Sequence, residues 1–367
     1  MIVPFLDLQA QYEALRVELD ASVFGVLRSG RYVGGEQIDM FEREFAAYCN
    51  TQFAVGCGSG TAALHMALLA LGIRQGDEVI TVANTFAATV EAITHVGATP
   101  VFVDVQEDTG NLNPERIRGA LSARSKAIVP VHLHGQCADM ARILAIARSC
   151  DLRVIEDAAQ AHGSESQGVI AGGIGDVGCF SFYPGKNLGA CGEAGAVTTS
   201  DPNIAMQISL LVSHGERPKN HHSIVGFNHR LDSIQAAILR VKLRNLPAWN
   251  TRRREIAARY LQAFRERPDI GVPANVALDE HSFHHFVVRV RHRDAVMARL
   301  AADGVSTMVH YPVPLHRQPA YANIARVSGP LTVTDNLSSE ILSLPIFPEM
   351  SDKQQDIVVK SLLKATE

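Results

Sequence analysis

From about residue 50 to residue 200, the chain alternates short runs rich in β-branched residues with stretches whose apolar residues recur at helical spacing. Strands that alternate with helices predict a parallel sheet covered on both faces, because parallel neighbours are joined by crossover helices. The predicted fold class is α/β, with a large, mostly parallel, seven-stranded sheet. The expected strands are 53–57, 78–82, 100–105, 126–132, 152–155, 178–182 and 196–199, and the expected helices are 61–71, 87–95, 114–121 and 139–150.

Beyond residue 201 the pattern changes to long helical stretches, and residues 230–264 look helical almost throughout. Pro247 lies inside that stretch and predicts a break or a kink. From about residue 271, short strands at 283–290 and 305–309 are mixed with helices at 294–302 and 352–364. We therefore expect two domains. Residues 1–245 form a large α/β domain with an N-terminal arm, and residues 246–367 form a bridging helix and a small C-terminal α+β domain.

The composition is that of an ordinary globular protein, with 47% hydrophobic and 20% charged residues among 367. A net charge of −4 gives no electrostatic reason to expect a nucleic-acid partner. Residues 1–15 lack a basic segment followed by an apolar stretch, and no apolar run approaches ~18 residues. We expect no membrane partner and a cytoplasmic location. The six cysteines include no CxxC pair, so reduced thiols are expected.

The strongest chemical signal is a pair of segments, residues 152–164 (LRVIEDAAQAHGS) and 179–189 (CFSFYPGKNLG). The first strand delivers Asp157 at its carboxyl end, and the second is followed by Lys186. Ligands of open α/β sheets bind outside the carboxyl ends of strands, where both side chains are expected. Pyridoxal 5'-phosphate needs a lysine for its Schiff base and a carboxylate opposite its pyridine nitrogen. Either residue alone is equally well explained as a turn lysine or a helix cap, but the pair favours this cofactor.

A glycine-rich turn at residues 56–64 (GCGSGTAAL) leads from a strand directly into a helix. Free backbone N–H groups and the helix dipole suit such a turn to a phosphate group. Ser181, on the strand before Lys186, could add a hydroxyl to the same phosphate. Glycines also serve merely to reverse the chain, so the turn by itself does not define a phosphate site.

Together these motifs resemble the sugar aminotransferases of the DegT/DnrJ/EryC1/StrS type, within fold type I of the pyridoxal-phosphate enzymes. The resemblance covers nearly the whole chain. The matching segments are residues 4–7 (PFLD), 29–35 (SGRYVGG), 84–86 (NTF), 156–160 (EDAAQ), 181–186 (SFYPGK) and 226–237 (GFNHRLDSIQAA).

The resemblance implies a role for each matching residue. Lys186 would carry the cofactor, Asp157 would meet the pyridine nitrogen, and Gln160 would lie near the ring and its phenolic oxygen. Phe86 would stack on the other ring face, although as an isolated residue it would be an ordinary core aromatic. The implied phosphate contacts are Gly60, Thr61, Ser181, and Asn228 reaching in from a neighbouring subunit. The chain would then be a homodimer with shared active sites.

Five residues are candidates for the substrate side. Tyr32 lies in the glycine-rich N-terminal turn and Tyr183 is close to the lysine, while the resemblance places His310 and Tyr311 near the active site. Aromatic and imidazole groups suit a sugar ring and its hydroxyls, and structural packing is the alternative for each. Arg230 is either a contact for a substrate phosphate or carboxylate, or a salt bridge at the start of a helix.

The resemblance also implies a reaction. L-glutamate would convert the cofactor to pyridoxamine 5'-phosphate, and a nucleotide-linked keto-sugar would then accept the amino group. Residues 181–196 look most like members that act on a dTDP-3-keto-6-deoxyhexose, giving an amino sugar for natural-product or surface-polysaccharide biosynthesis. Cys191 and Glu193 depart from the commoner leucine and aspartate on the substrate side. Alternatives are a C4 aminotransferase acting on a UDP-, GDP- or dTDP-4-keto sugar, and a non-catalytic homologue.

Rival readings of the sequence are weaker. Residues 173–178 (GIGDVG) fit the dinucleotide pattern GxGxxG, but they precede a strand instead of following one. Adjacent histidines at 221–222 and 284–285 rarely point at one ion, and the alternate pair His132 and His134 has no acidic or cysteine partner at a diagnostic spacing, so no metal is expected. Some relatives carry histidine in place of the lysine and are dehydratases of deoxysugars, whereas Lys186 favours transamination.

Overall fold

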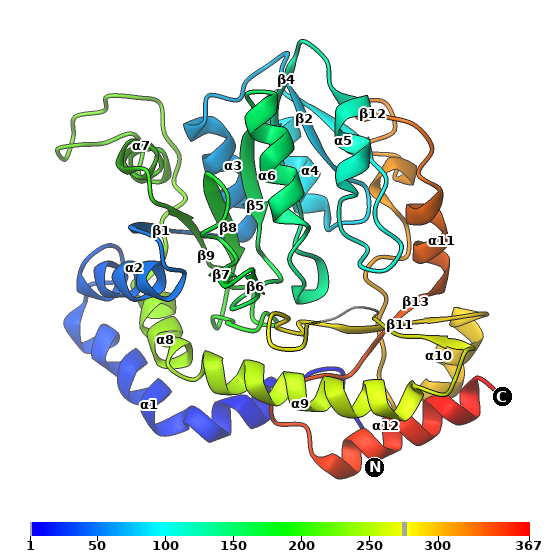
Figure 1. Ribbon diagram of the computed structural model, residues 1–367. Helices are drawn as coiled ribbons and strands as arrows, with labels where there is room; N and C mark the ends of the chain where they lie inside the picture. Colours follow the sequence, from blue (N-terminus) through cyan, green and yellow to red (C-terminus); the bar gives the residue numbers. More distant parts are fainter. Residues whose placement is uncertain (1, 274–276) are drawn as a thin grey trace.

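A central eight-stranded sheet organises the chain (Figure 1), in a computed structural model that describes residues 2–273 and 277–367. The strand order is β1-β9-β8-β5-β4-β2-β3-β12. The strands are β1 (Phe53–Cys57), β2 (Glu78–Val82), β3 (Thr99–Val103), β4 (Ser125–Ile128), β5 (Arg153–Asp157), β8 (Val177–Ser181), β9 (Gly195–Thr199) and β12 (Arg326–Val327). β9 is antiparallel to both of its neighbours, and the other pairs are parallel.

All seven predicted strands are present, and β12 adds a two-residue strand beyond β3. β12 comes from the C-terminal part of the chain and is too short to produce an alternating sequence pattern. β4 ends before the predicted residue 132. Val129 still donates a hydrogen bond to Ile80, and Pro130 then has no N–H to continue the ladder.

Helices cover both faces of this sheet because alternate strand residues point to opposite cores. On β8, Val177 and Cys179 face one core, and Phe180 faces the other. The first face carries α3 (Gly60–Ala70), α4 (Ala87–His95) and α7 (Pro202–Val212); the second carries α2 (Glu36–Tyr48), α5 (Pro114–Ala120), α6 (Met140–Ser149) and α8 (Ser233–Leu243). α1 (Leu8–Ser29) lies against α8, outside these layers.

The predicted break near Pro247 is confirmed. α8 ends at Leu243, and α9 (Leu246–Phe264) begins with Pro247 in its first turn. A proline is tolerated there because N–H groups of the first turn have no partner within the helix. α9 leads from the large sheet to the C-terminal part of the chain (Figure 1).

The C-terminal part has its own small sheet and core. Its strands are β10 (Ile270–Gly271), β11 (Phe286–Val290) and β13 (Ile341–Leu344), and its helices are α10 (Arg293–Ala302), α11 (Thr332–Glu340) and α12 (Asp352–Ala365). A separate short hairpin joins β6 (Glu165–Ser166) and β7 (Val169–Ile170). The predicted strand at 305–309 is wrong. Val305 pairs with Val3 and Met308 pairs with Ser343, so two single bridges to different partners replace a continuous ladder.

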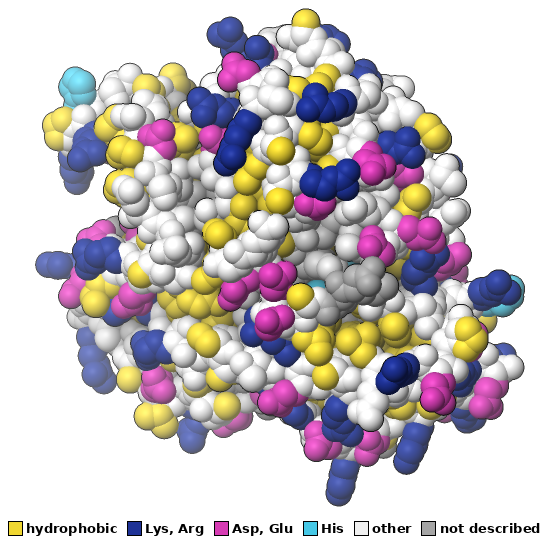
Figure 2. All heavy atoms as spheres, in the orientation of Figure 1, with side chains coloured by type: hydrophobic (Ala, Val, Ile, Leu, Met, Phe, Trp, Pro, Cys, Tyr) yellow, Lys and Arg dark blue, Asp and Glu magenta, His cyan; other side chains and the backbone are white. Residues whose placement is uncertain are grey.

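The surface mixes both signs of charge. On the face shown in Figure 2, basic and acidic side chains are interspersed instead of segregated. Within residues 2–273 and 277–367, every helix is either too short or too polar to cross a bilayer.

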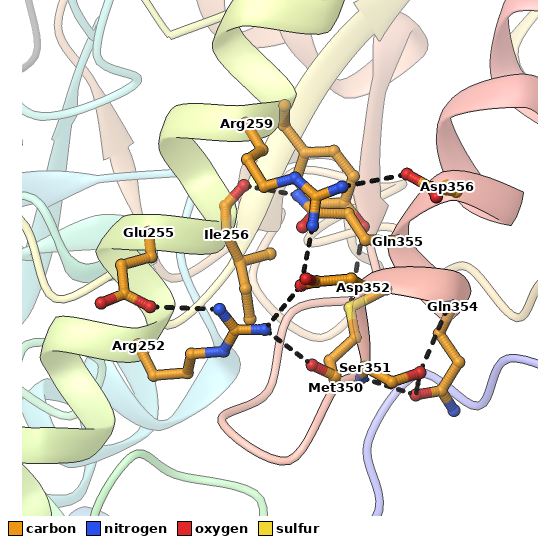
Figure 3. Close-up of polar contacts among 11 residues, drawn as sticks. Arg252, Glu255, Ile256, Arg259, Met350, Ser351, Asp352, Gln354, Gln355 and Asp356 are labelled. Carbon is orange, nitrogen blue, oxygen red and sulfur yellow. Dashed lines mark hydrogen bonds and ion pairs between the residues drawn. The ribbon is translucent and has the colours of Figure 1, made fainter.

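A polar network fastens α12 to α9 (Figure 3). The Asp352 carboxylate lies 3.1 Å from Arg252 and 2.7 Å from Arg259. Gln355, the buried member, donates from Nε2 to the carbonyl oxygen of Ile256 at 2.7 Å. The network therefore combines an exposed charged cluster with a buried neutral hydrogen bond.

The buried bond should contribute more to stability than the exposed ion pairs. We expect Gln355→Ala to lower the free energy of unfolding by about 1–3 kcal/mol, because a buried hydrogen bond and packed volume are lost. Asp352→Ala should cost less than about 1 kcal/mol, because water screens its two arginine contacts. Urea denaturation of the two variants measures both effects. A larger loss for Asp352→Ala would contradict the ranking.

Candidate active site

Lys186 and Asp157 are brought together at the carboxyl edge of two adjacent parallel strands. Asp157 is the last residue of β5, and its register partner Cys179 lies on β8, the strand that leads to Lys186. Burial lowers the pKa of Lys186 to about 8, while the nearby Asp157 carboxylate opposes this shift. A lysine with this pKa is partly neutral near physiological pH, as a nucleophilic amine must be.

The carboxylate of Asp157 is held by two donors. Thr89 Oγ1 on α4 donates to Oδ2 at 2.7 Å, and the backbone N–H of Ala159 donates to Oδ1 at 3.2 Å. Burial raises the pKa of Asp157, while these two bonds and the charge of Lys186 act in the opposite direction. A buried carboxylate with fixed donors is suited to hold a positive charge placed next to it.

The residue after the lysine fixes the lysine loop. The buried Asn187 donates from Nδ2 to Asn250 Oδ1 at 3.0 Å and to the carbonyl of Ser282 at 2.9 Å. Neither Asn187 nor Thr89 was singled out from the sequence. Position was the only signal for either residue. Asn187 directly follows the lysine, and Thr89 lies one turn into the helix that follows the NTF segment.

The glycine-rich turn lies directly beside the lysine strand. A Cβ on Gly60 would come within 2.6 Å of the Cβ of Ser181, so only glycine allows this approach. Ser59 caps α3 by accepting from the N–H of Ala62 at 3.1 Å. The N–H groups of the first turn, including that of Thr61, face the end of the helix where an anion is stabilised.

Four predicted ring and sugar residues gather around Asp157 and Lys186. Gln160 donates from Nε2 to the hydroxyl of Tyr311 at 3.1 Å, and the Phe86 and Tyr311 rings are 6.0 Å apart. Phe86 is 58% exposed, which leaves its ring free to stack on a ligand. Burial and the charge of Lys186 lower the pKa of His310 to about 4.

The remaining predicted residues lie at the surface of the single chain. Tyr32 and Tyr183 are about half exposed, and Asn228 is also exposed. Arg230 pairs through its backbone with Cys57 next to the glycine-rich turn. Its Nε atom is buried and has no hydrogen-bond partner among the described residues.

These features fit the predicted cofactor. A partly neutral lysine, a buried carboxylate, an exposed aromatic ring and a turn with free N–H groups surround one edge of the sheet. Each corresponds to a different part of pyridoxal phosphate: the aldehyde, the pyridine nitrogen, the ring face and the phosphate.

Glu42 supports the glycine-rich turn from below. Its Oε1 atom accepts from the N–H of Gly56 at 2.7 Å, and burial raises its pKa to about 7. In the unfolded chain this carboxyl ionises near its ordinary value of 4.5. Between about pH 4.5 and pH 7 the carboxyl is therefore protonated in the folded state and ionised in the unfolded chain. The free energy of unfolding falls as the pH rises through this range.

We expect Glu42→Gln to stabilise the protein at alkaline pH. The amide can still accept from Gly56 but carries no buried charge, so at about pH 8.5 the variant should exceed the wild type by about 1–3 kcal/mol. At about pH 4.5 the difference should nearly vanish, because Glu42 is protonated in the folded state. Urea unfolding at the two pH values measures this. An equal difference at both would show that Glu42 does not titrate as described.

The fold and the site together define an aminotransferase. The chain belongs to the DegT/DnrJ/EryC1/StrS aminotransferase family, which it matches over residues 13–363. It is 46% identical over 352 residues to the dTDP-3-amino-3,4,6-trideoxy-alpha-D-glucose transaminase of Streptomyces venezuelae, covering 96% of this chain and 93% of that protein. It is also 43% identical over 364 residues to the pleiotropic regulatory protein of Geobacillus stearothermophilus, covering 99% and 98%.

The structural comparison agrees with the sequence comparison. The crystal structure of S. venezuelae DesV in complex with a ketimine intermediate superposes with a TM-score of 0.97 at 44% identity. The match covers 100% of this chain and 99% of that one. The predicted fold type is therefore confirmed.

Proposed function

We propose that the chain transfers an amino group from L-glutamate to a dTDP-linked 3-keto-6-deoxyhexose, with pyridoxal phosphate as cofactor. The observation that carries this proposal is the buried pairing of Lys186, with a pKa near 8, and Asp157 at the carboxyl edge of β5 and β8. Membership of an aminotransferase family supports it independently.

When bound, the cofactor would supply an electron sink, and the protein's residues would bind it, orient it and transfer protons. The amine of Lys186 would attach the cofactor and would afterwards move a proton to and from the substrate carbon. Asp157 keeps a positive charge on the ring nitrogen, because Thr89 and Ala159 already stabilise its ionised form. Phe86 would stack on the ring and Gln160 would lie by its phenolic oxygen. Gly60, Thr61, Ser181, and Asn228 of a neighbouring subunit would hold the phosphate.

The sugar nucleotide is placed by the remaining candidates. Tyr183, His310 and Tyr311 would contact the sugar ring and its hydroxyls. Arg230 offers its unpaired guanidinium nitrogen to a phosphate or carboxylate, and Tyr32 approaches from the N-terminal turn. The name of the S. venezuelae relative favours dTDP and carbon 3 over UDP or GDP sugars and carbon 4.

The assembly proposed is a homodimer in the cytoplasm with shared active sites. The surface positions of Tyr32 and Asn228 support it, because a second chain can bring such residues to the site. We also propose the division into residues 1–245 and 246–367, with residues 315–337 returning from the second part to pack on the large sheet.

The second candidate is a regulatory homologue without catalysis, which the name of the G. stearothermophilus relative suggests. Lys186 and Asp157 favour catalysis, since a non-catalytic chain does not need either. The two candidates differ in the absorbance of the purified protein. The enzyme should show a visible cofactor band that bleaches with L-glutamate and returns with a dTDP-3-keto sugar.

Each other outcome identifies one part of the proposal. If the cofactor band returned only with a 4-keto sugar, or with a UDP or GDP sugar, the chain would be a transaminase with a different acceptor. If the band bleached with another amino acid and not with L-glutamate, that amino acid would be the donor. A protein that takes up no pyridoxal phosphate would be the regulatory homologue.

A further inference from the structure

Two sequence motifs that the proposed cofactor site does not use meet at one buried carboxylate. The dinucleotide-like segment 173–178 and His132 of the histidine segment 132–134 both form hydrogen bonds with Glu156, the residue before Asp157 on β5. The Glu156 side chain is fully buried. Successive residues of a strand point to opposite faces of the sheet, so the carboxylates of Glu156 and Asp157 lie on opposite faces of β5.

Backbone N–H groups of the glycine-rich segment bind the Glu156 carboxylate. Its Oε1 atom accepts from Ile174 at 2.8 Å and from Gly175 at 2.7 Å, and its Oε2 atom accepts from Gly172 at 2.8 Å. Neighbouring N–H groups that converge on one anion form a concave site of the kind that binds phosphate in other proteins. The occupant here is a side chain of the same chain, so these N–H groups are not free for a dinucleotide.

The glycines of this segment are required by close packing around Glu156. Gly172 has a φ of 88°, and a Cβ atom on it would overlap the ring of Phe180. A Cβ atom on Gly175 would come within 2.8 Å of the carbonyl oxygen of Val154. The glycine pattern therefore lets the backbone approach the carboxylate closely, and no external ligand is needed to explain it.

His132 supplies the fourth hydrogen bond to this carboxylate. The N–H of Ala138 donates to Nδ1 of His132 at 3.1 Å, so Nδ1 carries no proton and Nε2 must carry the proton of the neutral ring. Nε2 therefore donates to Oε2 of Glu156 at 2.9 Å. Both oxygens of Glu156 act only as acceptors, as those of an ionised carboxylate do.

The same histidine also holds the main chain of Asp157. His132 follows β4, which lies beside β5 (Figure 1). Its N–H donates to the carbonyl oxygen of Asp157 at 3.0 Å, and the N–H of Asp157 donates to the carbonyl oxygen of Pro130 at 2.9 Å. His132 thus joins the Glu156 carboxylate to the backbone of Asp157, so a displacement of its ring would also displace the end of β5.

We propose that Glu156 and His132 are positioning residues for Asp157. They fix the backbone at the end of β5, and Thr89 and Ala159 then fix the carboxylate of Asp157 itself. A side chain that must meet a ligand atom works only when its support holds it to within about 0.5 Å. This inference rests on the proposed function, in which Asp157 meets the ring nitrogen of the cofactor.

The test measures how much the ring nitrogen contributes to cofactor binding. Calorimetric titration compares pyridoxamine phosphate with its 1-deaza analogue, in which a C–H group replaces the ring nitrogen. Neither compound has an aldehyde that could react with Lys186. The wild type should bind pyridoxamine phosphate at least about tenfold more tightly than the analogue, because the analogue cannot form the charged hydrogen bond to Asp157. Asp157→Asn should lose most of this preference and sets the baseline.

Two substitutions of His132 separate its two side-chain hydrogen bonds. The amide nitrogen of His132→Gln can replace Nε2 as the donor to Glu156, and the amide oxygen of His132→Asn can replace Nδ1 as the acceptor from Ala138. We expect His132→Asn and Glu156→Gln to reduce the preference at least about threefold, and His132→Gln to keep most of it. The matched control is Gln355→Ala, which loses a buried hydrogen bond far along the chain and should keep the full preference.

The outcomes separate positioning from general destabilisation. The inference is overturned if His132→Asn binds both compounds as the wild type does, or if Gln355→Ala loses the preference to the same extent. Should Glu156→Gln fail to fold, the two His132 variants decide. A wild type that binds pyridoxamine phosphate without preferring it would refute the role of Asp157, and one that binds neither compound would refute the proposed function. Both results differ from a failure of positioning alone, in which the wild type keeps its preference and so do the variants.

Discussion

Replacing Lys186 with alanine should abolish transamination, with turnover falling by at least about 10²–10⁴-fold, the usual contribution of a positioned acid–base group. The methyl group of alanine can neither attach the cofactor nor move a proton at the substrate carbon. Lys186 is suited to both tasks because burial lowers its pKa to about 8. The loss should appear in the turnover number, since the phosphate turn and the Phe86 ring remain to bind the cofactor.

The matched control is Lys242→Met. Lys242 is another buried lysine with a pKa lowered by burial, but it lies on α8. Methionine keeps most of its length without its charge, so this variant should retain the cofactor band and most of the activity. Denaturing gel filtration then distinguishes attachment from binding: the cofactor of the wild type, trapped by borohydride, should stay with the chain, and that of Lys186→Ala should not. Near wild-type turnover in Lys186→Ala would refute the assignment.

Asp157→Asn should lower turnover by about 10²–10³-fold while leaving the cofactor attached to Lys186. The amide can still accept from Thr89 but cannot hold a positive charge on the ring nitrogen. Thr89→Val removes a single donor to Asp157 and should have a smaller effect, of about tenfold. The measurement is the rate at which L-glutamate bleaches the cofactor band. An unchanged rate in Asp157→Asn would mean that another acid performs this role.

The pH profile provides a second test of Asp157. Burial raises its pKa, so its carboxylate is ionised only above that raised value, and activity should be lost as the pH falls through it. Thr89 opposes the shift by donating to the ionised form. Thr89→Val should therefore move the acidic limb of the profile to higher pH. If the acidic limb did not move, Thr89 would not influence the pKa of Asp157.

The large sheet could be predicted from the sequence because short runs rich in β-branched residues alternate with stretches whose apolar residues recur at helical spacing. β12 could not, because two residues cannot show an alternating pattern and their pairing with β3 depends on a contact about 225 residues away. The segment 305–309 has the composition of a strand. Its two ends pair with different partners, which only the tertiary arrangement determines.

The candidate site divides in the same way. Lys186 and Asp157 could be predicted because strand ends in a parallel sheet converge, so position along the chain translates into position in space. Thr89 reaches Asp157 from a helix 68 residues earlier in the chain, and nothing in its local sequence indicates that contact. The proposed phosphate contact of Asn228 requires a neighbouring subunit, so its role stays a prediction, as does that of Tyr32.

Three of the contacts between the C-terminal part and the rest of the molecule lie far apart in the sequence. α9 carries the chain into it, β12 pairs with β3 at the sheet edge, and Val3 of the N-terminal arm bonds to Gly304 and Ser306. In Figure 1, α9 and β12 lie on opposite sides of the small-sheet strand β11. A body held at three points has no free hinge axis, so swinging it away from the sheet would break a strand pairing. The two parts should therefore tumble and vibrate as one unit, and a substrate should reach Lys186 through side-chain and loop movement alone.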